Sequence, residues 1–349
     1  MHRFEPPVTL SEHLLAAWYA PRLTLLTAAL VPLSLVFRAV VGLRRALYSL
    51  GALRSERLPV PVVIVGNIVV GGSGKTPLVI ALADEFRARG WHPGIVSRGY
   101  GGGASVARAV PSDSTAEDVG DEALLLARSG HPVWIGRDRP AAARGLLAEH
   151  AQCDLIVSDD GLQHYALHRN VEIAVVDAAR GLGNGLLLPA GPLREPASRL
   201  DRIDALVSTG GPWRQRGRLS FAMALEGNRF ARVNAPTVTI TAEAFRSGRI
   251  HALAGIGNPQ RFFDHLASLG IVAALHPFPD HHRFTPGELA LPGATAILMT
   301  EKDAVKCTAF ADDRCWVLPV RAVPDPALYT LVEEKLKWIP NCSRSSSAR

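Results

Sequence analysis

A glycine-rich segment followed by a lysine and a threonine is the part of the chain best suited to binding phosphate. The stretch VIVGNIVVGGSGKTP, residues 63–77, runs from an apolar segment through Gly71, Gly72, Ser73, Gly74, Lys75 and Thr76. Glycines let backbone N–H groups converge on phosphate oxygens, and the N-terminus of a following helix favours negative charge. Lys75 would reach the β- and γ-phosphates of a nucleotide, and the Thr76 hydroxyl would hold Mg²⁺. Position 69 is Val where the strict pattern has Gly, but the remaining glycines still predict a phosphate-binding loop.

Two adjacent aspartates could supply the metal ligands that a bound triphosphate requires. Asp159 and Asp160 follow the apolar run Leu155–Val157. Carboxylates at the end of a strand beside a phosphate-binding loop bind Mg²⁺ directly or through its waters. The sequence Asp-Asp-Gly is also common in simple turns. The phosphate-binding loop favours the metal-binding interpretation.

The apolar runs that would position these groups predict a parallel β-sheet. They are short, rich in β-branched residues, and followed by Gly, Asp or Ser: Val60–Val65, Leu155–Val157, Ile173–Val176 and Ala205–Val207. Such runs are typical of strands buried on both faces. Between the first two, Leu78, Leu82 and Phe86 share one helical face. We therefore expect a P-loop α/β/α domain over residues 58–217, with ligands beyond the carboxyl ends of its strands.

The rest of the chain predicts a linker and a second, smaller α/β/α domain. Within residues 218–249, two short apolar runs flank Glu226-Gly227-Asn228 and predict a hairpin. From Ile250 strand and helix patterns alternate again, which predicts the smaller domain over residues 250–340. The polar tail, residues 341–349, is expected to be disordered.

Residues 1–57 form a separate N-terminal segment whose centre is apolar. The chain is uncharged from Leu23 to Phe37, whereas a spanning helix needs about 20 apolar residues. A buried core helix would show the same composition. Trp18 and Tyr19 on one side and arginines on the other favour a membrane-associated helix, which either spans the bilayer or lies in its interface. The arginines expected on the cytoplasmic side are Arg38, Arg44, Arg45, Arg54 and Arg57.

Charge and cysteine content exclude several other classes of protein. The formal net charge is +6, but residues 1–57 alone hold seven Arg against three Glu. The remainder is nearly neutral and has no basic stripe, so no nucleic-acid partner is expected. The cysteines show no CxxC spacing, which argues against a zinc site or a disulfide framework and fits a reducing compartment. They are Cys153, Cys307, Cys315 and Cys342.

Six further motifs, taken with the phosphate-binding loop, carry a family resemblance. In chain order they are SRGYG (Ser97–Gly101), VGDE (Val119–Glu122), DDGLQH (Asp159–His164), GPLREP (Gly191–Pro196), FPDHHRF (Phe278–Phe284) and TEKDAVK (Thr300–Lys306). Over about residues 10–335 the chain resembles the tetraacyldisaccharide 4′-kinases, the membrane-associated lipid A kinases of Gram-negative bacteria. The resemblance implies Mg²⁺-dependent transfer of the ATP γ-phosphate to the 4′-hydroxyl of a tetraacylated glucosamine disaccharide 1-phosphate, which gives the bisphosphate precursor of lipid A. It also implies two α/β/α domains joined by a two-stranded linker, with the site in the cleft between them.

The resemblance assigns roles to three charged or titratable side chains. Asp121 is implied as the base that accepts the sugar hydroxyl proton, although an Asp at this position would also serve as a helix N-cap. A carboxylate at a helix N-terminus has a lowered pKa, so it needs a partner, and His281 is implied as that partner. The two residues lie in different expected domains, so they would meet only across the cleft. Arg194 in GPLREP is implied to neutralise charge at the γ-phosphate.

Five other positions are weaker candidates within the same motifs. Arg98 and Tyr100 follow an apolar run and a turn, and they are expected to contact the phosphate or sugar of the substrate. Gln163 and His164 would orient a metal-bound water or the acceptor, or would simply pack in the structure. Lys302 is a candidate contact to the nucleotide.

The expected partners are an acylated disaccharide lipid and a membrane surface, with no obligate protein partner. Removing acyl chains from a bilayer costs about 0.8 kcal/mol per CH₂. For four chains this exceeds any single-site affinity, so the acyl chains must remain in lipid during the reaction. We therefore expect the protein at the cytoplasmic face of the bacterial inner membrane.

Two other function classes remain as alternatives. A P-loop GTPase or ATPase acting as a regulator or metallochaperone would share the phosphate-binding loop. Guanine-specific members carry Asn/Thr-Lys-x-Asp, whereas this chain has Thr300-Glu301-Lys302-Asp303, with the lysine one place late. A membrane scaffold that uses nucleotide only as a conformational ligand is the second alternative.

Overall fold

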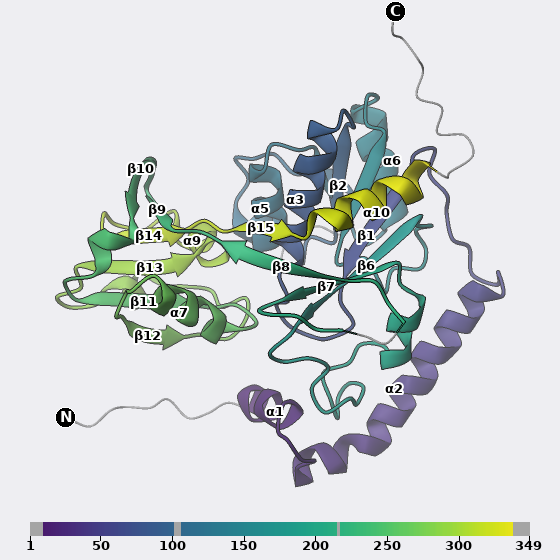
Figure 1. Cartoon of the computed structure of the whole chain (residues 1–349), viewed down its shortest axis with the longest axis horizontal. Coiled ribbons are helices and arrows are strands. Elements are labelled where there is room, and N and C mark those ends of the chain that lie inside the picture. The colour runs from purple at the N-terminus through teal and green to yellow at the C-terminus, as the bar shows by residue number, and fades with distance from the viewer. Residues whose placement is uncertain (1–9, 101–105, 215–216, 338–349) are drawn as a thin grey trace, which may run out of the picture.

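The computed structural model describes residues 10–100, 106–214 and 217–337, which form two α/β parts and an N-terminal pair of helices (Figure 1). Residues 1–9, Gly101 of SRGYG and the expected disordered tail at 341–349 lie outside the described residues. The expected P-loop-type α/β architecture with a second, smaller α/β part is confirmed.

The larger part is built on a nine-stranded sheet with the order β15-β8-β7-β6-β1-β5-β2-β4-β3. Its strands are β1 (Val62–Gly66), β2 (Pro93–Ser97), β3 (Arg108–Ala109), β4 (Val133–Ile135), β5 (Leu155–Asp159), β6 (Val171–Asp177), β7 (Ala205–Thr209), β8 (Ser220–Glu226) and β15 (Arg321–Pro324). The strands from β8 to β4 run parallel, and β15 and β3 pair antiparallel at the two edges. Strands β1 and β5 are buried along their whole length, because helices and loops cover both faces of a parallel sheet.

Helices cover both faces of this sheet. The helices of the larger part are α3 (Lys75–Ala88), α4 (Ala116–Val119), α5 (Asp121–Arg128), α6 (Arg139–Glu149) and α10 (Pro326–Lys337), with a short 3₁₀ helix at Ala197–Arg202. One core contains Leu78 and Leu82 of α3 together with Val332 of α10. Leu146 of α6 belongs to the core on the other face. The sheet therefore fixes where β1 and β5 end and where α3 begins.

The smaller part has a six-stranded sheet with the order β10-β9-β14-β13-β11-β12. Its strands are β9 (Arg229–Arg232), β10 (Ala235–Thr241), β11 (Ile250–Ala254), β12 (Ala274–Pro277), β13 (Ala296–Thr300) and β14 (Cys315–Leu318). Its helices are α7 (Pro259–Ser268), α8 (Pro286–Leu289) and α9 (Glu301–Cys307), with a 3₁₀ helix at Ala242–Phe245. Phe262 of α7 and Leu289 of α8 belong to two separate cores, so this sheet also is covered on both faces.

The chain crosses between the two sheets twice, and the expected hairpin at Glu226–Asn228 is wrong. Strand β8 belongs to the larger sheet and β9 to the smaller one, so the chain continues through Gly227 instead of turning back. It returns from β14 to β15, which pairs antiparallel with β8. A Cβ on Gly227 would lie 2.3 Å from the Pro319 carbonyl oxygen. Glycine is needed at this position because the two crossing segments approach closely.

The C-terminal segment also differs from the expected division at residue 250. Strand β15 and helix α10 return to the larger part instead of completing the smaller one. Leu328 and Leu336 of α10 are fully buried in the core that also contains α3. The apolar face of α10 packs against the larger sheet, which explains why the chain returns there. The strand pattern in the sequence did not show to which sheet this helix belongs.

The N-terminal helices are α1 (Leu10–Trp18) and α2 (Leu25–Ser49), and α2 lies along the outside of the larger part (Figure 1). Helix α2 is long and apolar enough to cross a membrane, and only 11% of its most apolar window is buried. This exposure disfavours a buried core helix. Trp18 does not face outward as an interfacial anchor, because it is buried and its Nε1 donates to the Pro189 carbonyl at 2.9 Å. Tyr19 packs against the core of the larger part and against Arg180.

We predict that Gly227→Ala destabilises the protein by about 1–3 kcal/mol, because the added methyl group overlaps the Pro319 carbonyl. Gly42→Ala is the matched control, since its Cβ would meet nothing within 4 Å and alanine favours the helix. Urea denaturation of both variants measures the difference. Equal midpoints for G227A and the wild type would contradict the tight crossing.

Candidate active site

The phosphate-binding loop joins β1 to α3 with its helix N-terminus open. Gly74 caps α3 with a left-handed φ of +89°, and a glycine has no side chain to occupy the first N–H groups of the helix. Those N–H groups therefore point toward a site suited to an anion. Val69, where the strict pattern has Gly, is buried and forms a β-bridge with Leu193. The valine that replaces the pattern's glycine thus pairs the start of the loop with Leu193 of the GPLREP motif.

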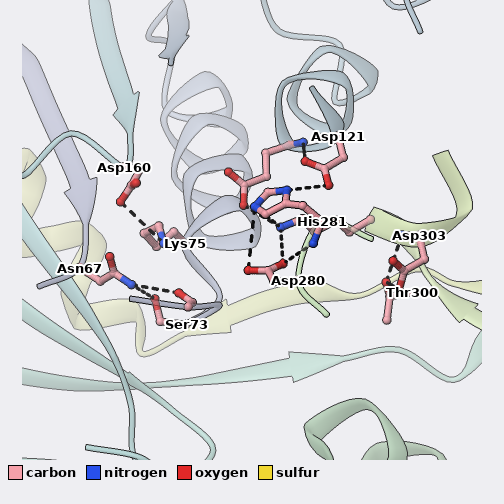
Figure 2. A network of polar contacts seen from close by, with 12 residues as sticks. Asn67, Ser73, Lys75, Asp121, Asp160, Asp280, His281, Thr300 and Asp303 are labelled. Carbon is pink, nitrogen blue, oxygen red and sulfur yellow. Dashed lines mark hydrogen bonds and ion pairs between the residues drawn. The ribbon is translucent and has the colours of Figure 1, made fainter. Parts of the chain in front are cut away.

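Side chains from two strand ends hold the loop in this shape. Asn67 Nδ2 donates to the Gly71 carbonyl at 3.2 Å and to Ser73 Oγ at 3.3 Å (Figure 2). Thr209, at the end of β7, donates from Oγ1 to the Ser73 carbonyl at 3.2 Å. The loop is therefore preorganised before any ligand binds.

Asp160 brings two predicted cationic side chains together. Lys75 Nζ lies 3.7 Å from Asp160 Oδ1, and Arg194 Nη1 donates to Oδ1 and Oδ2 at 3.0 and 2.8 Å. Partial burial acts to raise the pKa of Asp160, but Lys75 and Arg194 hold it well below its usual range. The GPLREP arginine therefore lies at the phosphate-binding loop, as the family resemblance implied.

Asp159 is buried directly beside this group, and its carboxylate is unsatisfied. It is 1% exposed, and among the described residues neither carboxylate oxygen has a hydrogen-bond partner. Burial, with the nearby Glu122 carboxylate, raises the pKa of Asp159 to about 7. A buried carboxylate without donors is costly. This arrangement is suited to binding a cation.

Asp121 and His281 meet across the two parts of the protein (Figure 2). Asp121 is the first residue of α5, and His281 lies between β12 and α8 with a left-handed φ of +61°. His281 Nδ1 lies 3.0 Å from Asp121 Oδ2. Lys302 Nζ lies 3.3 Å from the other ring nitrogen, Nε2. Because an ammonium can only donate, the neutral imidazole carries its proton on Nδ1 and donates it to Asp121.

The pKa values of the pair shift in opposite directions. The hydrogen bond to Asp121 raises the pKa of His281 above its ordinary value, although burial and Lys302 oppose the shift. Burial acts to raise the pKa of Asp121, but His281 and Lys302 hold it below the usual range. The expected lowering of the Asp121 pKa thus has a different main cause, since the expectation rested on the helix N-terminus.

A cavity of about 660 Å³ lies between the two parts and is lined by residues from both of them. One wall contains the loop and helix residues Gly72–Thr76 and the start of α5 at Glu122. The other wall comes from the smaller part and includes Phe262 and Lys302. Lys302 also pairs with Glu122 at 3.1 Å and with Asp280 at 3.0 Å. The phosphate-binding loop and the neighbours of the Asp121–His281 pair therefore face one cavity.

The remaining predicted residues occupy different positions around this centre. Tyr100 is 60% exposed, and its ring centroid lies 5.1 Å from that of His281. Arg98 is exposed after β2. Gln163 Nε2 donates to the Asn67 carbonyl and to Glu195, both at 3.0 Å. Burial, with Arg139 and Arg44 nearby, lowers the pKa of His164 to about 4, so its ring is neutral. Gln163 therefore contacts protein groups, and the orienting role of Gln163 and His164 stays a prediction.

Arg139 is a site residue that the sequence did not reveal. It is 2% exposed and lies behind the paired aspartates, with Nη1 donating to Ser158 Oγ at 2.6 Å and to the Asp159 carbonyl at 2.7 Å. It fixes the backbone that carries both carboxylates. It is the first residue of α6, and no local pattern distinguishes it from the many surface arginines.

A second contact between the two parts involves the loop after β11. Asn258 Nδ2 donates to Asp177 Oδ2 at 2.9 Å, and the Gly257 carbonyl accepts from Arg180. A Cβ on Gly257 would lie 2.1 Å from the Gly72 nitrogen. The smaller part thus rests directly on the phosphate-binding loop, which closes the cavity on this side.

Comparison with known proteins identifies the family to which the chain is similar. Residues 26–337 match the model of the tetraacyldisaccharide-1-P 4′-kinase family. The chain is 54% identical to the tetraacyldisaccharide 4′-kinase of Azoarcus sp. over 84% of this chain and 87% of that one. It is 46% identical to the Pseudomonas aeruginosa enzyme of the same name, over 95% and 99%.

A solved structure shares the fold. The crystal structure of LpxK from Aquifex aeolicus in complex with ATP superposes with a TM-score of 0.75 at 30% identity, covering 89% of this chain and all of that one. Together with the family match, this similarity establishes that the chain belongs to the tetraacyldisaccharide-1-P 4′-kinase family.

Proposed function

We propose that this chain transfers the γ-phosphate of ATP to the 4′-hydroxyl of a tetraacylated glucosamine disaccharide 1-phosphate. The single observation that carries the proposal is the shared cavity, which joins a phosphate-binding loop to the surroundings of the Asp121–His281 pair. A kinase needs a cradle for the donor phosphates and a proton acceptor for the acceptor hydroxyl. This site offers both.

ATP fits the cavity with its phosphates at one end and its base along the apolar wall. The N–H groups at the start of α3 and the Lys75 ammonium would bind the phosphates. Met223, Leu225 and Phe262 line the same cavity and offer apolar surface to a nucleobase. The Aquifex aeolicus structure, which is a complex with ATP, supports this choice of nucleotide.

Mg²⁺ suits the oxygen ligands beside the loop. Thr76, Asp159 and Asp160 would hold it, and the unsatisfied carboxylate of Asp159 is the observation that supports this assignment. When bound, the ion supplies charge neutralisation to the phosphate oxygens. Its binding also favours the ionised form of Asp159, whose pKa is about 7 without it.

The protein's own contribution is positioning and charge stabilisation. Lys75 and Arg194, both held by Asp160, lie where they can neutralise charge on the transferred phosphate. The Asp121 carboxylate accepts N–H donors from Glu122 and His281 and keeps lone pairs for the acceptor hydroxyl. We infer that the hydroxyl proton passes to Asp121 within the hydrogen-bonded pair, while Arg98 and Tyr100 contact the sugar or its phosphate.

The acceptor is expected to reach the cavity from a membrane surface. Helix α2 exposes large apolar side chains along its length, including Leu33, Val36 and Leu43. Such a face suits insertion into the cytoplasmic leaflet of the inner membrane, where the acyl chains can stay in lipid while only the sugar enters the site. Carbonate extraction distinguishes a spanning helix, which stays with the membrane, from an interfacial one.

The alternative functions are less well supported. Family membership disfavours a regulatory GTPase, a metallochaperone or a scaffold. In addition, Asp303, the last residue of the near-match to a guanine motif, is fully buried and accepts from the Gly255 N–H at 2.9 Å. It is therefore already engaged inside the smaller part.

The direct experiment incubates purified protein with Mg-ATP and the disaccharide 1-phosphate in detergent micelles. We expect a bisphosphate product, separated by thin-layer chromatography and identified by mass spectrometry. Phosphate release that is independent of the lipid acceptor, with no bisphosphate, would contradict the proposal.

Lys75→Ala should reduce turnover by at least about a hundredfold, because a preorganised cation at the transferring phosphate is lost. Membrane association should be unchanged, since Lys75 is buried at the phosphate-binding loop and is not part of the exposed apolar face of α2. Lys337→Ala, an exposed lysine paired with Glu333 at 3.0 Å, is the matched control and should retain full activity. Near-normal turnover of K75A would remove the phosphate-binding loop from the mechanism.

The acid limb of kcat/KM should lie above pH 6.5 in the wild type, the ordinary pKa of histidine being about 6.5. The pair accepts a proton only while His281 is neutral, and the Asp121 contact raises its pKa. Activity is therefore lost as the pH falls through that raised value. His281→Gln should be slower, and its acid limb should move to lower pH.

His282→Gln serves as the control for this profile. His282 pairs with Glu288 at 2.8 Å instead of with Asp121, so its removal should leave the acid limb in place. The substrate phosphates titrate equally in all three proteins. An unchanged limb in H281Q would mean that His281 is not the group whose titration controls activity.

A further inference from the structure

The N-terminal helices are attached to one segment of the larger part, residues 184–195. Trp18 Nε1 donates to the Pro189 carbonyl at 2.9 Å, and the Asn184 N–H donates to the Trp18 carbonyl at 2.8 Å. Ser34, buried on α2, donates from Oγ to the Leu187 carbonyl at 2.8 Å. The exposed helix is thus seated on this segment by specific hydrogen bonds.

The other side of the 184–195 segment pairs with the start of the phosphate-binding loop. The Val70 N–H donates to the Pro192 carbonyl at 2.9 Å, and the Arg194 N–H donates to the Ile68 carbonyl at 2.7 Å. A single layer of backbone therefore separates α2 from the loop that binds phosphate.

An ion pair joins α2 to the end of the 184–195 segment. Arg45 Nε lies 3.8 Å from Glu195 Oε1, and the Glu195 side chain is 1% exposed. Glu195 also accepts from Gln163 Nε2 at 3.0 Å, and the same Gln163 nitrogen donates to the Asn67 carbonyl at 3.0 Å. Tyr165 and Arg199 complete its surroundings. Glu195 is thus paired with the membrane-facing helix through Arg45, and it is linked through Gln163 to Asn67, the residue that follows β1 at the start of the phosphate-binding loop.

Glu195 directly follows Arg194, whose Nη1 lies 2.8 Å from Asp160 Oδ2. We propose that Arg45 is a positioning residue for phosphoryl transfer: through Glu195 it holds Arg194 and the start of the phosphate-binding loop in their working arrangement. The inference rests on the proposed function. It gives α2 a role in the rate of the reaction as well as in membrane attachment.

The physical reason is the buried carboxylate. Removing one partner from a buried charged group leaves it less compensated, and the group or its surroundings then rearrange. Glu195 cannot move without displacing Gln163 or the backbone of Arg194, because it is bonded to the first and adjacent to the second. A displacement of about 1 Å at a transferring phosphate has large effects on rate. Loss of Arg45 should therefore lower kcat more than it raises KM.

The competing interpretation is that Arg45 only anchors the helix to lipid, since its side chain is 22% exposed. An anchor would concentrate the enzyme at anionic lipid and change the KM for the lipid substrate. Arg38 offers the matched comparison, because it is an exposed arginine on the same helix. The two roles therefore predict different kinetic parameters for the two arginines.

The experiment measures kcat and lipid KM in mixed micelles for the wild type, R45A, R45K and R38A, with vesicle co-sedimentation of each. We expect R45A to lose about tenfold in kcat with lipid KM and sedimentation within about twofold of the wild type. R45K should recover most of the rate, because the positive charge returns. R38A should keep its kcat at saturating lipid.

A double-mutant cycle separates positioning from general damage. If Arg45 acts through Glu195, then R45A should cost E195Q little or no further rate. A multiplicative loss in R45A/E195Q, a kcat of R45A equal to the wild type, or equal effects of R45A and R38A would each overturn the proposal. R45Q repeats the measurement if R45A aggregates. Failure of the wild type itself to form bisphosphate would instead overturn the proposed function, and this inference with it.

Discussion

The hydrogen bond between His281 and Asp121 sets the strictest condition on the rest of the structure. Its two residues are 160 positions apart, with Asp121 at the start of α5 in the larger part and His281 between β12 and α8 in the smaller part, so neither part can form the pair alone. The crossing strands at Gly227 fix how closely the sheets approach. The Asn258–Asp177 contact holds the smaller part on the phosphate-binding loop. Because a hydrogen bond of 3.0 Å is lost after a small displacement, both of these contacts must hold the two parts in nearly one relative position.

In the larger part, the charged side chains at the phosphate-binding loop are already in position without substrates. Asp160 holds two cationic side chains at the N-terminus of α3, while the buried and unpartnered Asp159 carboxylate stays available to a cation. Both aspartates sit on backbone that the buried Arg139 fixes. Such preorganisation matters because phosphoryl transfer requires little covalent help from the protein. The attachment of α2 to the 184–195 segment connects this centre to the exposed apolar helix.

The sequence predicted those parts that depend on local pattern. The loop before Lys75 and the buried strands around it follow from glycine spacing and apolar runs, and the structure contains them. The Asp121–His281 contact was anticipated only through the family resemblance, because no local pattern relates two residues in different parts of the protein. Gly227 was misread because a glycine between two strands can mark a turn or a close crossing. Arg139 gave no signal, since its importance comes from burial behind the aspartates, which only the folded chain creates.

The most direct test of the central claim is a double-mutant cycle on kcat/KM with Asp121→Asn, His281→Ala and the combined variant. If the two side chains act as one proton-accepting unit, the combined variant should be no more than about threefold slower than the slower single variant. A combined loss equal to the product of the two single losses would contradict the account, since the residues would then contribute independently.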